Sequence, residues 1–252
     1  MRILFIGDVV GKVGRRMLKN YLPGLKKEHG AHFTIVNGEN AAHGKGITER
    51  TYKEILSAGA DFITLGNHTF AKREVYDLLN TDVKMVRPAN FPEGTPGKGA
   101  KVVNINGKKL LIVNLQARSF LEPIENPFKV IDKILDAHDY DQAFVDFHSE
   151  TTSESIAMGY YLDGRVNAVV GTHTHVQTND ATRLENGTVY ITDVGMTGFK
   201  DGILGIRKDE VIRRFITNLP ERHVVPDEGK GVISGVIIDT DQKSIENFKV
   251  EE

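Results

Sequence analysis

The sequence predicts an α/β fold with two β-sheets flanked by helices, and two observations support this prediction. The first half alternates short apolar runs, typical of buried strands, with longer segments in which apolar residues recur at helical spacing. Because a β-α-β-α-β order joins parallel neighbours through helices, we expect a mostly parallel first sheet. Hairpin and turn signals follow in the second half, so we expect its strands to be increasingly antiparallel.

The first half is expected to form three strands and two helices. They are a strand over residues 2–8, a helix to about residue 27, a strand over 33–37, a helix from Thr48 to Gly59 and a strand over 61–65. Val13, Met17 and Leu18 begin the helical repeat of the first helix. Thr48 can cap the second helix, and Gly59 can end it.

The second half begins with a Pro- and Gly-rich segment over residues 86–99, either a lid near the site or a plain connection. Asn106 and Gly107 then suit the type I′ turn of a hairpin. The expected elements are hairpin strands over 101–105 and 109–114, helices over 127–137 and 152–161, strands ending before His148 and His173, a strand over 189–193, and an antiparallel pair over 231–239 and 245–250. We expect one domain over residues 1–252.

The composition excludes several classes of protein. With 252 residues and 40% hydrophobic content, the chain can bury a large core. Its 32 basic and 34 acidic residues give a formal charge of −2 without a block of like charges, which argues against a long basic footprint for duplex nucleic acid. Cysteine is absent, so a metal would be held by oxygen and imidazole nitrogen. The first apolar run is too short for a signal or a membrane span, and a cytoplasmic location is expected.

Polar residues follow five of the apolar runs, where each predicted strand ends. They are Asp8, then Glu39 and Asn40, then Asn67 and His68, then His148, and finally His173 and His175. Ligands bind at the carboxyl ends of strands in open α/β sheets, so these side chains are expected to meet at one metal site. His173 and His175 can share that site only if they lie in a turn, because a strand would point them to opposite faces.

The number of candidate ligands favours two metal ions. Asp8, Glu39, Asn40, Asn67, His148, His173 and His175 are seven candidates. One ion rarely takes more than about four to six protein ligands, and catalytic sites leave a position open. A carboxylate can bridge two ions, and Glu39 is the candidate for that role. Imidazole, carboxylate and amide ligands suit iron, manganese, zinc and similar cations. We expect iron or manganese, in divalent or mixed-valence form, with zinc as an alternative.

The order of these blocks resembles the metallophosphoesterase (calcineurin-like) superfamily over nearly the whole chain. The matching segments are Asp8, Gly38-Glu39, Gly66-Asn67-His68, His148 and Gly171-Thr172-His173-Thr174-His175. Val10 stands where that superfamily usually has His, and Gly38-Glu39-Asn40 replaces Gly-Asp. These departures characterise the YmdB-like branch, which Arg87-Pro88-Ala89-Asn90 and Asp193-Val194-Gly195-Met196-Thr197-Gly198 also resemble.

The resemblance implies a double-sheet sandwich that holds two metals and hydrolyses phosphodiesters. By analogy, the first metal is held by Asp8, Glu39, Asn40 and His175, and the second by Glu39, Asn67, His148 and His173. A metal-bridging hydroxide is the expected nucleophile. The branch implies cyclic nucleotides as small-molecule substrates, with 2′,3′-cyclic nucleotides opened to 3′-nucleotides and 3′,5′-cyclic AMP as a further substrate.

A leaving ribose alkoxide needs a proton, and His68 is the candidate general acid because it adjoins Asn67 without being needed as a ligand. Two other functions fit the same residues. One is a phosphomonoesterase or protein phosphatase on the same fold, and the other is a regulatory protein that binds a nucleotide or a partner with little turnover. A homo-oligomer is compatible with the sequence, and no membrane association is expected.

Overall fold

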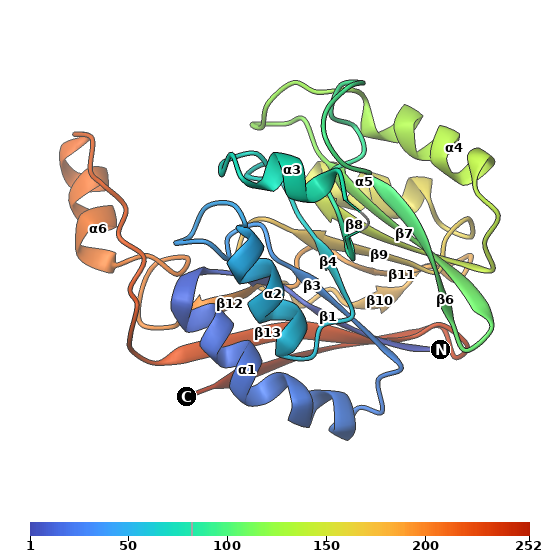
Figure 1. Ribbon diagram of the computed structural model, residues 1–252, viewed down its shortest axis with the longest axis horizontal. Helices are drawn as coiled ribbons and strands as arrows, with labels where there is room; N and C mark the ends of the chain where they lie inside the picture. Colours follow the sequence, from blue (N-terminus) through green and yellow to red (C-terminus); the bar gives the residue numbers. More distant parts are fainter. Residues whose placement is uncertain (82) are drawn as a thin grey trace.

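In the computed structural model, which describes residues 1–81 and 83–252, two sheets pack face to face between helices (Figure 1). Within these residues the larger sheet has eight strands and the smaller has six. The larger has the order β2 (Asp8–Val9), β12 (Met196–Phe199), β13 (Gly231–Asp239), β1 (Arg2–Ile6), β3 (Phe33–Asn37), β4 (Phe62–Thr64) and β5 (Met85–Val86), and β14 (Ser244–Glu251) pairs with β13. The smaller has the order β10 (Thr182–Arg183), β11 (Val189–Ile191), β9 (Ala168–Thr172), β8 (Gln142–His148), β7 (Lys108–Gln116) and β6 (Ala100–Ile105).

Helices cover the outer faces of both sheets. α1 (Gly11–Glu28), α2 (Glu49–Ser57) and α3 (Val75–Leu79) pack on the larger sheet, and α4 (Pro127–Ala137) and α5 (Thr152–Tyr161) pack on the smaller one. A sixth helix, α6 (Lys208–Thr217), covers neither face. No helix in the described parts of the chain is long and apolar enough to cross a membrane. α6 stands away from the body of the molecule, and Val211 is its one buried residue.

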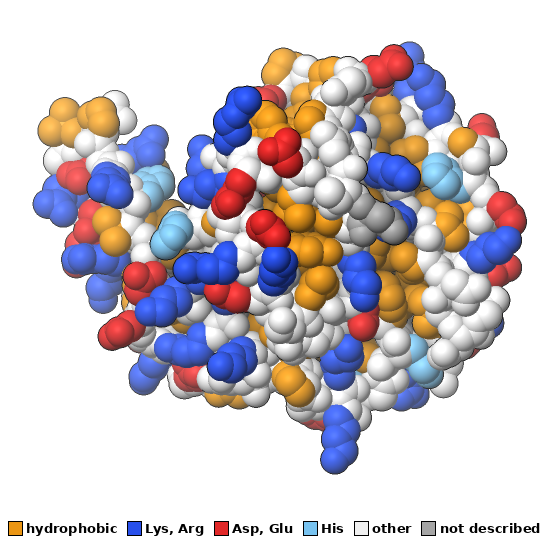
Figure 2. Space-filling model, viewed as in Figure 1, with side chains coloured by type: hydrophobic (Ala, Val, Ile, Leu, Met, Phe, Trp, Pro, Cys, Tyr) orange, Lys and Arg blue, Asp and Glu red, His pale blue; other side chains and the backbone are white. Residues whose placement is uncertain are grey.

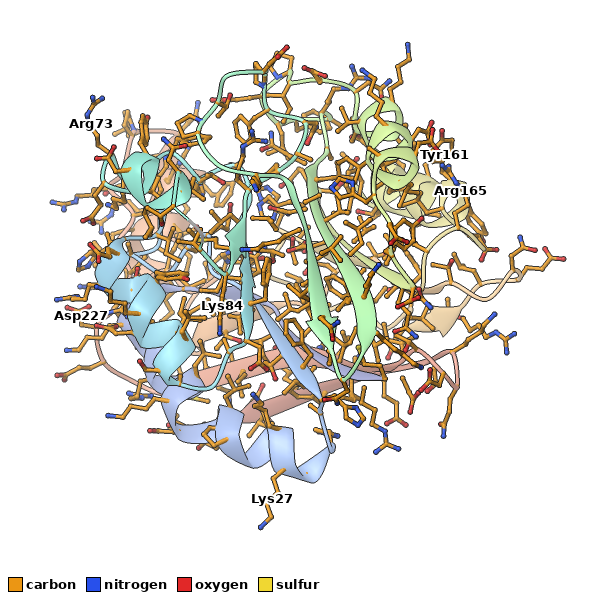
Figure 3. All side chains as sticks on the ribbon, turned by 45° about the vertical axis from the view of Figure 1, so that its right-hand side comes forward. Lys27, Arg73, Lys84, Tyr161, Arg165 and Asp227 are labelled. Atoms are coloured by element: carbon orange, nitrogen blue, oxygen red, sulfur yellow. The ribbon has the colours of Figure 1, made fainter. Side chains whose placement is uncertain are left out.

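The side chains of β1 point alternately to the two faces of the larger sheet, so this strand contributes to two hydrophobic cores. Leu4 and Ile6 face the helix-covered side, while Ile3 and Phe5 face the second sheet. The ring centroids of Phe5 and Phe144 lie 5.3 Å apart in the core between the sheets. Side chains fill the interior of the molecule around the strands (Figure 3). A strand buried on both faces needs apolar residues throughout, which is why its sequence is a continuous apolar run.

Local signals predicted several elements well. The helices over 127–137 and 152–161 and the strand over 231–239 have the predicted bounds. Thr48 caps α2 in a capping box with Thr51. Asn106 and Gly107 have positive φ values of 51° and 88°, as the type I′ hairpin turn between β6 and β7 requires.

The second half is antiparallel only in part. The hairpin of β6 and β7 and the closing pair of β13 and β14 are antiparallel, as predicted, whereas β7, β8, β9 and β11 are parallel neighbours. β12, β13 and β14 join the larger sheet, beside β1 and β2. Strand pairing joins residues far apart in the sequence, so local patterns do not show which sheet a strand enters. The strands β5, β10 and β12 and the helices α3 and α6 were not predicted. The three strands and α3 have only two to five residues, and most apolar residues of α6 remain exposed.

The segment over 86–99 is organised around one buried cation. The guanidinium of Arg87, whose side chain is buried, donates hydrogen bonds to five backbone carbonyls, those of Pro88, Ala89, Thr95, Pro96 and Gly97. Burial lowers the pKa of Arg87, so these carbonyl dipoles must offset the cost of placing a charge there. Whether this segment is also a lid stays a prediction.

We expect Arg87→Ala to lower the free energy of unfolding by ~2–4 kcal/mol, because several carbonyls would lose a charged donor. Arg87→Lys should recover part of that loss, since an ammonium reaches fewer of the carbonyls. Urea unfolding of the metal-free chain measures both effects. The exposed Arg183 serves as the control, and Arg183→Ala should change stability by less than ~0.5 kcal/mol. Equal stability of the Arg87 and Arg183 variants would contradict this role.

Candidate metal centre

The structure brings together all eight predicted site residues at the carboxyl ends of parallel strands. Asp8 lies on β2, and His148 is the last residue of β8. The loops that follow β3, β4 and β9 contribute the others: Glu39 and Asn40, Asn67 and His68, and His173 and His175. Asp8, Glu39 and His148 are fully buried, which separates their charges from solvent.

One group of contacts surrounds His148. Its Nε2 lies 3.0 Å from Asn67 Oδ1, 3.0 Å from His173 Nδ1 and 3.2 Å from Glu39 Oε1. Ligand atoms of Glu39, His148 and His173 all lie within 4.8 Å of one another. These four residues are the set that the resemblance assigned to the second metal.

A second group surrounds His175. Its Nε2 lies 3.1 Å from Asn40 Nδ2 and 3.9 Å from Asp8 Oδ2, and Asn40 Nδ2 lies 2.9 Å from Glu39 Oε1. Glu39 Oε1 therefore contacts both groups. Asn40 turns its Oδ1 toward His68 Nδ1, at 2.9 Å, so rotation of the amide would be needed to point this oxygen at His175.

Backbone geometry after β9 brings both histidines to the site. His173 and His175 have φ values of 110° and 65°, which confirms that the loop turns as their spacing requires. Before them, Gly171 packs so closely that a Cβ there would lie 1.7 Å from Thr192 O. The loop after β4 also needs a glycine, Gly66, because it passes close to Glu39 and His148. A Cβ at Gly66 would lie 2.2 Å from Glu39 Oε2 and 2.4 Å from His148 Nε2.

Burial and neighbouring charges shift the ionisation of this cluster. Burial opposes a charge on either Glu39 or His148, but their mutual attraction outweighs it, so the pKa of Glu39 falls and that of His148 rises to about 9. Burial and the nearby His148 lower the pKa of His173 to about 3. Burial raises the pKa of Asp8 well above its usual range, and Glu39 and Asp193 add to this rise.

These residues fit a cation. Asp8 Oδ1 is buried without a hydrogen-bond partner among the described residues, while Oδ2 accepts the backbone N–H of His173 at 2.9 Å. An unpaired buried carboxylate oxygen is costly unless a positive charge compensates it. The surrounding donors are imidazole nitrogens and amide and carboxylate oxygens, which suit transition-metal ions. A cation would also favour ionised Asp8 and neutral His148.

Two supporting residues, Thr172 and Glu150, were missed from the sequence. Thr172 Oγ1 lies 2.8 Å from His148 Nδ1 and donates to Asp146 Oδ1 at 2.7 Å, so Asp146 positions the imidazole through a hydroxyl. Glu150 Oε2 lies 2.8 Å from His173 Nε2. Thr172 precedes His173 within the motif and was the available signal, whereas nothing in the local sequence marked Glu150.

This fold and this cluster define a metallophosphoesterase-like enzyme, a hydrolase that acts on phosphoric diesters, as predicted. A family model described as YmdB-like protein matches residues 4–252, and the chain belongs to that family. A 2′,3′-cyclic-nucleotide 2′-phosphodiesterase from Bacillus subtilis is 56% identical, and the alignment covers 100% of this chain and 96% of the relative.

Solved structures of relatives have the same fold. A hypothetical protein from Thermus thermophilus has a TM-score of 0.95 at 42% identity, with both chains fully covered. A phosphatase from Mycoplasma pneumoniae has a TM-score of 0.90 at 36% identity, and the alignment covers 100% of this chain and 93% of that one. The predicted double-sheet fold is thereby confirmed.

We expect metal binding near neutral pH to release at least one proton per chain. The pKa of about 9 means that His148 is protonated in the metal-free protein, and it must be neutral to bind a metal. Metal affinity should therefore increase as the pH rises toward 9. Calorimetric titration with Mn²⁺ in buffers of different ionisation enthalpy measures the released protons. Binding near neutral pH without proton release would contradict this charge state.

We expect Gly66→Ala to reduce metal affinity by ~100-fold, because the added methyl group would displace Glu39 and His148. Gly24→Ala in α1 is the matched control, since its Cβ would meet no atom within 4 Å. Elemental analysis after dialysis against Mn²⁺ compares the two variants. Full metal content in the Gly66 variant would show that this close approach is not needed.

Proposed function

We propose that this protein hydrolyses 2′,3′-cyclic nucleotides to 3′-nucleotides at a two-metal centre, with 3′,5′-cyclic AMP as a further substrate. The observation that carries the proposal is the position of Glu39, whose Oε1 contacts both the His148 group and Asn40 of the His175 group. A carboxylate between two sets of nitrogen and oxygen donors suits a pair of metals. The substrate assignment draws on the Bacillus relative.

Two metal ions, with iron or manganese preferred, would activate a shared water for in-line attack and offset charge on the phosphoryl oxygens. Asp8, Glu39, Asn40 and His175 would hold the first, and Glu39, Asn67, His148 and His173 the second. The water oxygen forms a bond to phosphorus, and the bond from phosphorus to O2′ breaks. The proposal also includes a single domain over 1–252 and a cytoplasmic location.

In this proposal His68 would protonate the departing O2′. Its side chain is 27% exposed, and its Nδ1 lies 2.9 Å from Asn40 Oδ1 and 3.4 Å from Glu39 Oε1. Its backbone N–H donates to Glu39 Oε2 at 3.1 Å. Contacts with both residues orient the ring, and the partial exposure leaves it accessible to a substrate.

Turnover of 2′,3′-cyclic AMP by protein of known metal content tests the proposal, and 3′-AMP is the expected product. A marked preference for p-nitrophenyl phosphate over bis(p-nitrophenyl) phosphate would favour a phosphomonoesterase instead. Tight nucleotide binding by the metal-loaded protein without turnover would favour a regulatory role.

We expect His68→Ala to keep both metals and to lower the rate on 2′,3′-cyclic AMP by ~10²–10⁴-fold. The loss on bis(p-nitrophenyl) phosphate should be much smaller, since p-nitrophenolate leaves without a proton. His43→Asn is the matched control, because His43 is exposed in the same region and its φ of 57° is one that Asn tolerates. Equal losses on both substrates would refute the acid role.

We expect Glu39→Gln to lose at least one metal, since the neutral amide would no longer balance two cations. Elemental analysis of the purified variant measures this directly. A full complement of two metals would show that the bridging role is assigned wrongly.

A further inference from the structure

A basic cleft lies between α1 and α2, outside the candidate metal centre. Its volume is about 700 Å³, and six of its lining residues are cationic: Lys12, Arg15, Arg16, Lys19, Arg50 and Lys53. Glu54 is the one carboxylate among its nine lining residues. Basic side chains gather on this face of the molecule (Figure 2), although the whole chain has a formal charge of −2. Arg16 and Lys53 pair with Glu252 and Glu49, which lie outside the lining, so the excess positive charge comes from Lys12, Lys19 and the two arginines that share Glu54. This excess favours an anionic ligand.

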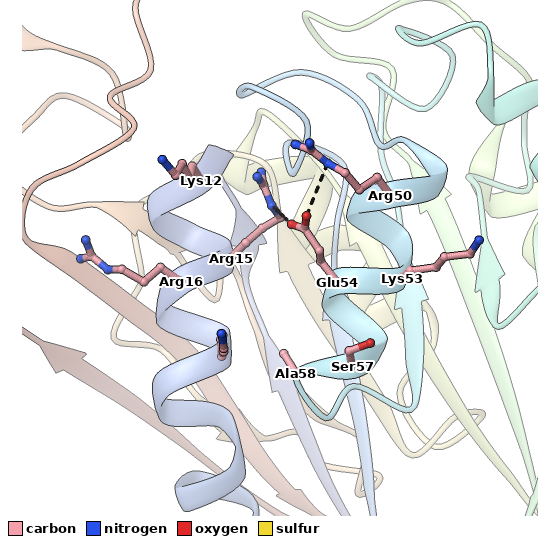
Figure 4. A pocket seen from close by; sticks show the side chains of 9 residues that line it. Lys12, Arg15, Arg16, Arg50, Lys53, Glu54, Ser57 and Ala58 are labelled. Atoms are coloured by element: carbon pink, nitrogen blue, oxygen red, sulfur yellow. Dashed lines mark hydrogen bonds and ion pairs between the residues drawn. The ribbon is translucent and has the colours of Figure 1, made fainter.

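The cations are arranged along the cleft. Arg15 and Arg50 converge on the two oxygens of Glu54, at 2.5 and 3.4 Å, and Lys12 lies beside them at the same end (Figure 4). Lys12 and Lys19 lie two turns of α1 apart, about 10 Å along its axis. Neither has a side-chain hydrogen bond or ion pair in the described part of the chain. A row of cations suits successive phosphates better than one isolated anion.

At one end of the cleft, residues of α1 form hydrogen bonds with the loop that carries Asn40 of the candidate metal centre. Arg15 Nη1 donates to the carbonyl oxygen of Ala41, the residue after Asn40. The backbone N–H of Gly11, at the start of α1, donates to Asn40 O at 3.0 Å. The first turn of α1 therefore contacts both the cleft and the loop that carries two candidate ligands.

From this arrangement we propose that the α1–α2 cleft binds the phosphate backbone of a short single-stranded oligoribonucleotide. The chain would be oriented with its 3′ end toward the metal centre. This inference rests on the proposed function, because a 2′,3′-cyclic phosphate is also a 3′-terminal group of RNA. The substrate class would then include oligoribonucleotides with a cyclic phosphate end, beyond free mononucleotides.

Fluorescence anisotropy with a labelled single strand of about eight nucleotides tests binding to the metal-loaded protein. We expect the double variant Lys12→Glu/Lys19→Glu to weaken binding at least tenfold and to reduce the salt dependence of Kd. Lys129→Glu/Lys133→Glu is the matched control, since both lysines are exposed on α4, on the far side of the fold. Equal affinities of the two double variants would overturn the proposal.

Competition experiments distinguish the classes of phosphate ligand that could bind in the cleft. The single strand should compete more strongly than ATP or a duplex of the same length. Stronger competition by ATP would assign the cleft to nucleoside polyphosphates and overturn the oligonucleotide assignment. Oligonucleotide binding without turnover of 2′,3′-cyclic AMP would refute the proposed function alone, whereas turnover of the mononucleotide without oligonucleotide binding would refute the cleft alone.

A second, independent observation concerns Gln116, the last residue of β7. It is fully buried, and neither polar atom of its side chain has a hydrogen-bond partner in the described structure. Gln116 pairs in register with His148 on the parallel strand β8, so both side chains lie on the same face of the sheet. Leu65 N–H donates to Asn114 Oδ1 at 3.2 Å, which brings the chain leading to Asn67 over β7.

We infer that the amide of Gln116 binds a phosphoryl oxygen of the substrate beside His148. In Gln116→Leu the metal-free protein should melt at an equal or higher temperature, because the variant buries no unpaired amide. Metal content should not change, and Kd for inorganic phosphate, measured by calorimetry on the metal-loaded protein, should rise ~10-fold. An unchanged Kd or a lost metal would overturn the assignment.

Discussion

The buried pair formed by Glu39 and His148 is the interaction on which the candidate site depends. Both side chains are fully buried, and their atoms lie 3.2 Å apart. Two charges removed from water are tolerable only when they compensate each other or bind a cation. The pair also joins the two sheets, since Glu39 follows β3 and His148 ends β8. The pair therefore both helps to hold the two sheets together and supplies two of the candidate metal ligands.

The need to compensate buried charges also explains why the residues around Glu39 and His148 are polar although they are buried. Asp146 accepts hydrogen bonds from Thr64, Thr172 and Asn37, which come from three different strands or strand ends. Such a network holds His148 in one orientation and links the edges of both sheets. Polar groups at this depth need partners, and the sequence supplies them at alternate positions of each strand.

The sequence predicted local structure and the composition of the site better than it predicted topology. Strand ends, capping residues and the Asn106-Gly107 turn are local signals, and the structure agrees with them. The eight site residues could be proposed because each follows an apolar run and because their order resembles a known superfamily. The orientation of the Asn40 amide and the contact between Glu150 and His173 depend on tertiary packing, which no local pattern contains.

The position of β13 in the larger sheet has a consequence for synthesis of the protein on the ribosome. β13 lies between β1 and β12, and β12 pairs in turn with β2, which carries Asp8. β1 therefore lacks its antiparallel neighbour until residues 231–239 have been made. Asp8 also contacts His173, which lies 165 residues later. Because long-range pairing is slow and requires both partners, nascent chains that lack β12 and β13 do not yet have the pairing that holds β2, and with it Asp8, in the larger sheet.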